Sequence, residues 1–170
     1  KQKEFKAVGI RVPLGNFSTN QARQLANLVA TYAASEIRFT LRQNIIIPYV
    51  RESILPYFFQ ELRKLNLAAP GYNTAADITA CPGTDTCNLG IASSTGIAGE
   101  LERVIASEYP QFLENPDLVI KIGGCMNACG QHNMAHIGFQ GMSLKTADKR
   151  VAPALQVLLG GGNLGNGKGF

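Results

Sequence analysis

The residues of this chain best suited to chemistry are four cysteines, which lie in two segments rich in glycine, threonine, asparagine and aspartate. Their spacings are Cys81-x5-Cys87 and Cys125-x3-Cys129. Cysteines in such groups bind metals, pair as disulfides or stay as buried thiols. Buried thiols favour apolar runs, which these segments are not. A disulfide framework is typical of small secreted domains, and we find no secretory signal in the sequence.

Metal binding has two forms to weigh. Zinc favours pairs of C-x2-C knuckles, a spacing that neither cysteine pair has. One zinc set would join the second pair to the two histidines that follow it: Cys125, Cys129, His132 and His136. It would leave Cys81 and Cys87 without a role. A [4Fe–4S] cluster needs four thiolates and accounts for all four cysteines. Small residues beside them would let backbone N–H groups approach the sulfides: Gly83, Gly123, Gly124, Ala128 and Gly130.

The first part of the chain predicts a β-α-β-β-α order. Alternating apolar residues predict strands over 6–13, 36–40 and 45–50, and Pro48 predicts that the last of these is an edge strand or carries a bulge. Helical spacing of apolar residues begins at 18–19, with Thr19 or Asn20 as the expected cap. A second helix is expected over 53–65, with this apolar stripe: Leu55, Phe58, Phe59, Leu62 and Leu65.

The sequence changes character near 68–71, so we predict domains over 1–69 and 70–170. The second part predicts a helix over 97–108, a break over 110–116 and a buried strand over 117–122. Two paired strands are expected over 137–142 and 153–159, followed by a glycine-rich tail. The fold class predicted from this order is α+β, with helices on one face of a mixed sheet.

Composition excludes several classes. Hydrophobic residues make up 45% of the 170, which is enough for a core and too many for a disordered chain. No apolar run reaches the roughly 18–20 residues of a membrane span. The net charge of +4 is spread along the chain without a nucleic-acid-binding motif. We therefore expect a soluble, cytoplasmic protein without a nucleic-acid or membrane partner. Charged residues are only 16%, which predicts an exposed apolar or weakly polar face.

Several segments together resemble the sirohaem-containing nitrite and sulfite reductases. The cysteine segments TACPGTDTCNL (79–89) and GGCMNACGQH (123–132) carry the resemblance, with IGFQG (137–141) after them. Upstream, VPLG (12–15) and EIRFTLRQNIII (36–47) are similar to the ferredoxin-like repeat of that family. The similarity runs from about 6 to 165, and it is to the second, cysteine-bearing half of the family's two-fold repeat.

The resemblance implies a ferredoxin-like half-unit followed by a mixed-sheet domain that binds sirohaem and an iron–sulfur cluster. It implies that Cys81, Cys87, Cys125 and Cys129 hold a [4Fe–4S] cluster. Cys129 would also bind the sirohaem iron, and electrons would pass from the cluster to sirohaem for the six-electron reduction of nitrite or sulfite. Sirohaem carboxylates need cations and amide donors, for which the candidates are these: Arg42, Gln43, Asn44, Asn127 and Asn163.

The resemblance also implies partners beyond this chain. The family's basic residues around the bound anion come largely from the first half, so we assign no catalytic residue here and expect the isolated chain to be inactive and to retain either cofactor poorly. The expected partners are the missing N-terminal half, nitrite or sulfite, and an electron donor such as ferredoxin or an NAD(P)H-linked flavoprotein. Two alternatives stay open: a fragment of a precorrin-3B synthase-like monooxygenase, and a stand-alone module for electron transfer or tetrapyrrole binding.

Overall fold

The structure is a computed structural model that describes residues 3–113 and 115–162. By the contacts within it, the chain divides into two compact units, Lys1–Tyr72 and Asn73–Phe170. Each unit is described by itself below. None of the described helices is both long and apolar enough to cross a membrane.

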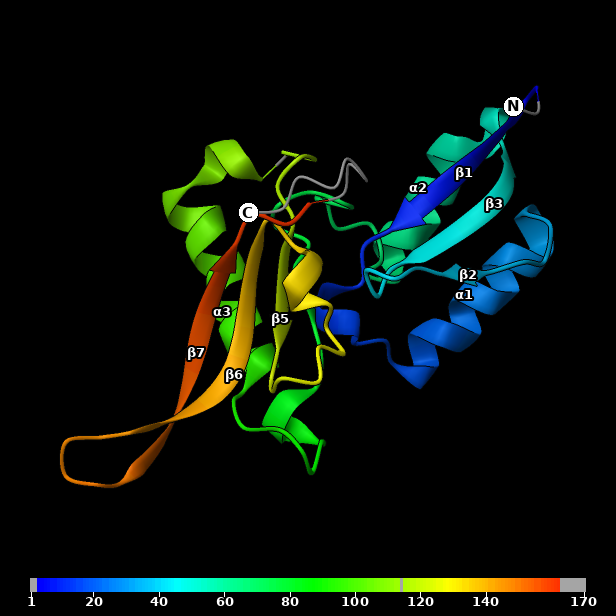
Figure 1. Cartoon of the computed structure of the whole chain (residues 1–170). Helices are drawn as coiled ribbons and strands as arrows, with labels where there is room; N and C mark the ends of the chain where they lie inside the picture. The colour runs from blue at the N-terminus through cyan, green and yellow to red at the C-terminus, as the bar shows by residue number, and fades with distance from the viewer. Residues whose placement is uncertain (1–2, 114, 163–170) are drawn as a thin grey trace. The chain divides into compact units, whose positions relative to one another are not determined.

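The first unit is a sheet packed against two helices (Figure 1). Strand β3 (Ile45–Arg51) lies between β1 (Phe5–Ile10) and β2 (Arg38–Phe39) and is antiparallel to both. The helices are α1 (Thr19–Tyr32) and α2 (Leu55–Lys64). Short 3-10 turns, Pro13–Gly15 and Glu52–Ile54, follow β1 and β3. The predicted β-α-β-β-α order is confirmed. The core of this unit is made of apolar side chains from β1, β3 and both helices, among them Ile10, Leu25, Val29, Ile47, Val50, Phe58 and Leu62.

Two local expectations for the helices are wrong. The cap of α1 is Ser18, not Thr19 or Asn20, because Ser18 keeps an extended backbone and its hydroxyl accepts a hydrogen bond from the Gln21 N–H. The Gln21 side chain reaches back to the Ser18 N–H and completes a capping box. Phe59, expected in the apolar stripe of α2, is half exposed, since only Phe58 and Leu62 on this helix are turned into the core.

Pro48 produces a bulge in a central strand. The pair Lys6 with Val50 is followed by Val8 with Ile47, so β3 holds one extra residue in this interval. Tyr49 accordingly has a positive φ of 59°. The bulge was predicted, whereas the alternative of an edge strand is wrong. Because β2 pairs only with Ile45 and Ile46, the missing N–H of Pro48 breaks no bond on that side.

The second unit contains a mixed sheet in the order β4-β5-β6-β7. Strands β4 (Thr79–Ala80), β5 (Ile120–Gly123) and β6 (Ile137–Lys145) are parallel, and β7 (Val151–Leu159) returns antiparallel to β6. The predicted pair of strands is confirmed, as is the α+β class. The sequence did not predict β4, which is only two residues long, and it placed the start of β5 three residues early. The β6–β7 hairpin extends beyond β5 (Figure 1).

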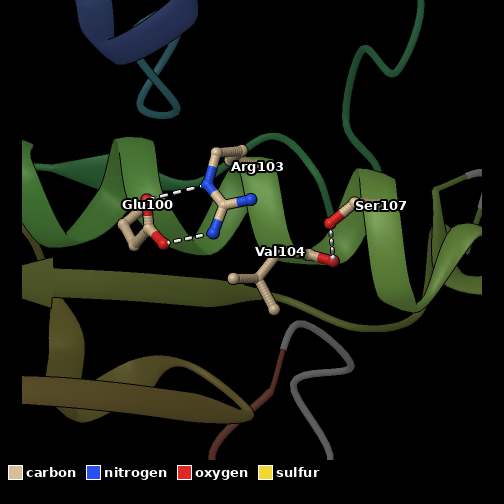
Figure 2. A network of polar contacts seen from close by, with 4 residues as sticks. All are labelled: Glu100, Arg103, Val104 and Ser107. Carbon is tan, nitrogen blue, oxygen red and sulfur yellow. Dashed lines mark hydrogen bonds and ion pairs between the residues drawn. The ribbon is translucent and has the colours of Figure 1, made fainter.

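Helix α3 (Ser94–Glu108) packs on β4 and β5. It begins three residues before the predicted start because the Ser93 hydroxyl caps it by accepting from the Gly96 N–H. Its exposed side carries an ion pair between Glu100 and Arg103 (Figure 2), which contributes little to stability because both groups face solvent. Ala98 on its inner side is completely buried.

Large apolar side chains lie exposed in and beside β2 and along the β6–β7 hairpin: Phe39, Leu41, Leu144, Val151, Val157 and Leu159. The predicted continuous apolar face stays a prediction. A nine-residue edge strand with such side chains is unusual on a protein surface, because open strand edges invite pairing.

A buried amide joins two loops at one end of the first sheet. Asn44 is fully buried, and its Oδ1 accepts a hydrogen bond of 2.9 Å from the Val12 N–H. Its own N–H donates to the Thr40 hydroxyl, and its carbonyl accepts from the Thr40 N–H. These bonds tie the end of β1 to the turn between β2 and β3.

Replacing this amide should destabilise the first unit. In Asn44→Ala the Val12 N–H loses its partner inside the core, so we expect a loss of about 1–3 kcal/mol in the free energy of unfolding, measured with urea. Asn27→Ala on the exposed side of α1 is the control and should stay within about 0.5 kcal/mol of the parent. Equal stability of the two variants would contradict this role for Asn44.

Candidate metal centre

All four cysteines lie in the second unit, and none is in a disulfide. Cys125 is buried and Cys81 is partly buried, whereas Cys87 and Cys129 are exposed. The disulfide alternative is therefore not what the structure shows, and neither is a set of four buried thiols. The two exposed thiols come from the two different loops, so each loop contributes one inner and one outer cysteine.

The sheet brings the two cysteine loops together. Cys81 follows β4 and Cys125 follows β5, and the carboxyl ends of parallel neighbours lie at the same edge of a sheet. The Cys81 N–H donates to the Ile122 carbonyl, which extends the β4–β5 ladder into the first loop. The Gly124 N–H then donates to the Cys81 Sγ at 3.1 Å. In return, the Gly124 carbonyl accepts from the N–H groups of Ile91 and Ala92 at the end of the first loop.

Glycines make this close packing possible. A Cβ on Gly124 would lie 2.7 Å from the Gly83 Cα, so the two loops touch backbone to backbone. A Cβ on Gly130 would lie 2.1 Å from the Ile122 carbonyl oxygen, and one on Gly141 would lie 2.2 Å from that of Gly124. Both ends of the second loop are therefore pressed against the sheet. Side chains at these positions would push the cysteine loops apart.

Cys81 is the thiol that the fold prepares most clearly for ionisation. Burial raises the pKa of the Cys81 thiol, but the hydrogen bond from the Gly124 N–H and the contact with the Ser94 hydroxyl outweigh it and leave the pKa below the usual value. A thiolate is the form that binds metal, so these contacts favour a bound metal as well as the free anion.

The donor set fits an iron–sulfur cluster in its chemistry: four free thiols on two loops with backbone N–H groups beside them. Among the described residues, however, no three His, Cys, Asp or Glu side chains stand close enough to hold a metal ion as they are. The zinc alternative gains no support for the same reason, because no three of Cys125, Cys129, His132 and His136 stand close enough together. One nitrogen of each histidine ring is engaged: His136 Nδ1 accepts from the Val119 N–H, and His132 Nε2 pairs with Gln140.

The residues predicted to hold sirohaem carboxylates fall in both units. Arg42, Gln43 and Asn44 lie together in the turn between β2 and β3, whereas Asn127 is exposed in the second cysteine loop. Asn163 lies outside the described residues. The Arg42 Nη1 atom is buried with no hydrogen-bond partner in the described part of the chain, which fits an anionic group such as a carboxylate. Asn44 already has the structural bonds described above. Cofactor contact at these positions stays a prediction.

The sequence analysis does not identify several residues that contact the cysteine loops. Ser94 is one, and nothing in its sequence context marks it. Lys121 is another, although a lysine inside the otherwise apolar strand pattern DLVIKI is a visible signal. Gln131 and Gln140 also belong here, because Gln131 bonds to Lys121 and Gln140 bonds to His132.

The chain is similar to known proteins in both sequence and structure. Residues 1–65 match the family model "Nitrite/Sulfite reductase ferredoxin-like half domain". The chloroplastic ferredoxin–nitrite reductase of Zea mays is 30% identical over 95% of this chain and 28% of its own length. A ferredoxin sulfite reductase of Mycobacterium tuberculosis is 30% identical over 98% of this chain and 30% of its length. The solved structure of the M. tuberculosis NirA protein superposes with a TM-score of 0.79 at 28% identity, over 98% of this chain and 31% of that one.

In sequence and in fold, this chain is similar to part of the nitrite and sulfite reductases. The matches to the relatives span nearly all of its length and both of its units, so the similarity does not depend on the cysteine loops alone. The chain spans about three tenths of the length of these relatives.

The close backbone packing of the second loop predicts that a side chain at Gly130 destabilises the chain. Gly130→Ala would place a methyl group against a backbone carbonyl, so we expect a loss of about 1–3 kcal/mol or more in a urea unfolding measurement. Ser107→Ala, at an exposed position on α3, is the control and should stay within about 0.5 kcal/mol of the parent. A G130A chain as stable as S107A would contradict the packing described here.

The contact between Ser94 and Cys81 leads us to predict that removal of the serine hydroxyl changes the pKa of the Cys81 thiol. In the metal-free chain, Ser94→Ala removes the hydroxyl contact that lowers the pKa of the Cys81 thiol, so this pKa should rise and alkylation of Cys81 should need a higher pH. The measurement is the pH dependence of iodoacetamide labelling at Cys81, followed by peptide mass spectrometry. Ser107→Ala, an exposed serine on the same helix, should leave that curve unchanged. A curve for S94A that matches the parent would rule out the hydroxyl contact as a cause of the lowered pKa.

Proposed function

We propose that this chain is the cluster-bearing half of a nitrite or sulfite reductase, in which Cys81, Cys87, Cys125 and Cys129 hold a [4Fe–4S] cluster. When bound, the cluster and sirohaem would relay, one at a time, the six electrons that an external donor provides. The chain's own contribution is to bring the four thiolates to one place, to stabilise their charge with backbone N–H groups, and to hold the tetrapyrrole by its carboxylates.

The observation that carries this proposal is the hydrogen-bonded contact between the two cysteine loops. The Gly124 N–H donates to the Cys81 Sγ, and the Gly124 carbonyl accepts from the first loop, so the protein backbone itself joins two cysteine loops that lie far apart in sequence. A fold that needed these thiols only for packing would have no reason to place two of them on the surface. Thiols next to backbone N–H groups suit iron–sulfur chemistry.

Support for a sirohaem site comes from the first unit. The buried Nη1 of Arg42 without a partner in the described residues suits a carboxylate of the cofactor, and Gln43 in the same turn is proposed to add an amide donor. Asn127, in the second unit, is proposed on the resemblance alone. Cys129, exposed at the end of the second loop, is the thiolate we assign to the sirohaem iron. Asn163 is proposed on the resemblance alone.

The remaining parts of the enzyme are proposed to lie in sequence that the relatives have and these residues do not cover. The chain spans about three tenths of the relatives, several of which are named for ferredoxin and for nitrite or sulfite. We therefore propose nitrite or sulfite as substrate, ferredoxin as one possible class of donor, and a further half that supplies the basic residues around the anion. The 170 residues alone should then show no six-electron reductase activity.

Anaerobic reconstitution of the chain with iron and sulfide tests the proposal directly. We expect about four irons and four sulfides per chain and a brown protein that absorbs near 400 nm. Cys87→Ser and Cys129→Ser should each lower the content of both elements, because each removes one ligand. Met126→Ala, an exposed change between the ligands of the second loop, should leave the content unchanged. Uptake of zinc without sulfide, or equal loading of the cysteine variants, would contradict the proposal.

A further inference from the structure

A buried cation lies in the strand that leads into the second cysteine loop. Lys121, in the middle of β5, is only 7% exposed, and its neighbours Ile120 and Ile122 are buried on the opposite face of the strand. Helix α3 packs on β4 and β5, and the turn His132–Met134 packs on β5 and β6. Figure 1 shows the helix and this turn on opposite sides of the sheet. The lysine is therefore enclosed between the sheet and the chain that leaves the second loop.

The ammonium group of Lys121 contacts a residue with an unusual backbone. Its Nζ donates to the Gln131 Oε1 at 2.6 Å, in a hydrogen bond strengthened by the charge. Gln131 has a φ of 58°, and Ala128 in the same loop has a φ of 56°. Residues other than glycine rarely adopt this conformation, so contacts with the surroundings must hold it in place. The Gln131 N–H also donates to the Ala128 carbonyl at 2.7 Å, which closes the loop as a tight turn.

The residue that follows fixes the same turn to the sheet. His132 is 1% exposed and its Nε2 lies 3.2 Å from the Gln140 Oε1 on β6. A Cβ on Gly123 would lie 2.2 Å from the His132 Nδ1, and one on Gly138 would lie 2.0 Å from the His132 carbonyl oxygen. In the register of the sheet, Lys121 pairs with Gly138 and Gly123 with Gln140, so these contacts share one face. His132, just after the second loop, is thus packed directly against Gly123 and Gly138 of the sheet, where no larger side chain would fit.

We propose that Lys121 is a positioning residue for the candidate metal centre. It precedes Cys125 on β5, and Gln131 follows Cys129, so the Lys121–Gln131 bond closes the second loop across its base. The bond presets the loop for its ligands, and the buried positive charge stabilises the anionic thiolates and the added electron of the reduced cluster. This inference rests on the proposed function in so far as it concerns the cluster.

The loop itself can be tested in the metal-free chain. Lys121→Met keeps the apolar stem and removes the charge, and Gln131→Asn keeps a residue that tolerates positive φ but is too short to reach the lysine. Both should open the second loop, so iodoacetamide should label the buried Cys125 faster by about tenfold or more. Lys145→Met, at an exposed lysine on β6, is the matched control and should keep the parent rate. Parent rates at Cys125 in both test variants would overturn the inference.

The charge can be tested in the reconstituted chain. Relative to the parent and to K145M, K121M should hold less cluster or hold it at a more negative midpoint potential, measured by a redox titration followed by electron paramagnetic resonance. A K121M chain with the parent's iron and sulfide content and the parent's potential would overturn the inference. If the parent itself takes up no iron and sulfide, the proposed function fails, while the labelling of Cys125 still decides whether Lys121 positions the loop.

Discussion

The candidate centre depends on the backbone of one residue, Gly124. Its N–H donates to the Cys81 Sγ, its carbonyl accepts from Ile91 and Ala92, and its Cα faces Gly83 with no room for a side chain. The backbone of this one residue thus connects the first loop, the second loop and the Cys81 thiol. Because the backbone approaches this closely, a larger residue here would separate the loops before any metal could join them. This contact can form because the parallel neighbours β4 and β5 end at the same edge of the sheet.

The chemistry of the two faces of this sheet differs for a physical reason. One face of β5 is apolar and suits packing against α3, whereas the other carries a lysine enclosed with glutamine and histidine side chains. Burying an ammonium group is costly in free energy unless it is hydrogen-bonded and has negative charge nearby. An apolar residue at Lys121 would satisfy the fold more simply. A lysine kept at this buried position is consistent with the positioning role proposed for it beside the second cysteine loop.

Much of this could be predicted from the sequence, because its strongest signals are local. The spacing of Cys81 and Cys87 and of Cys125 and Cys129 marked the donor set, and apolar periodicity marked most helices and strands. The cap at Ser18, the short strand β4 and the register of Lys121 with Gly138 could not be predicted in this way. These features depend on contacts between backbone groups in the folded chain, and the residues near them in sequence show no apolar periodicity. The bulge at Pro48 lies between these cases, since proline restricts the strand but only the partner β1 selects the outcome.

The different exposure of the cysteines suggests how such a centre would assemble. Cys125 is buried where β5 ends, and Cys81 is held by Gly124 and Ser94, so this inner pair is placed by the fold itself. Cys87 and Cys129 are exposed on the outer parts of the loops and must turn inward to share a cluster with the inner pair. If the four thiols hold a cluster, its binding free energy would be linked to the folding of both loops.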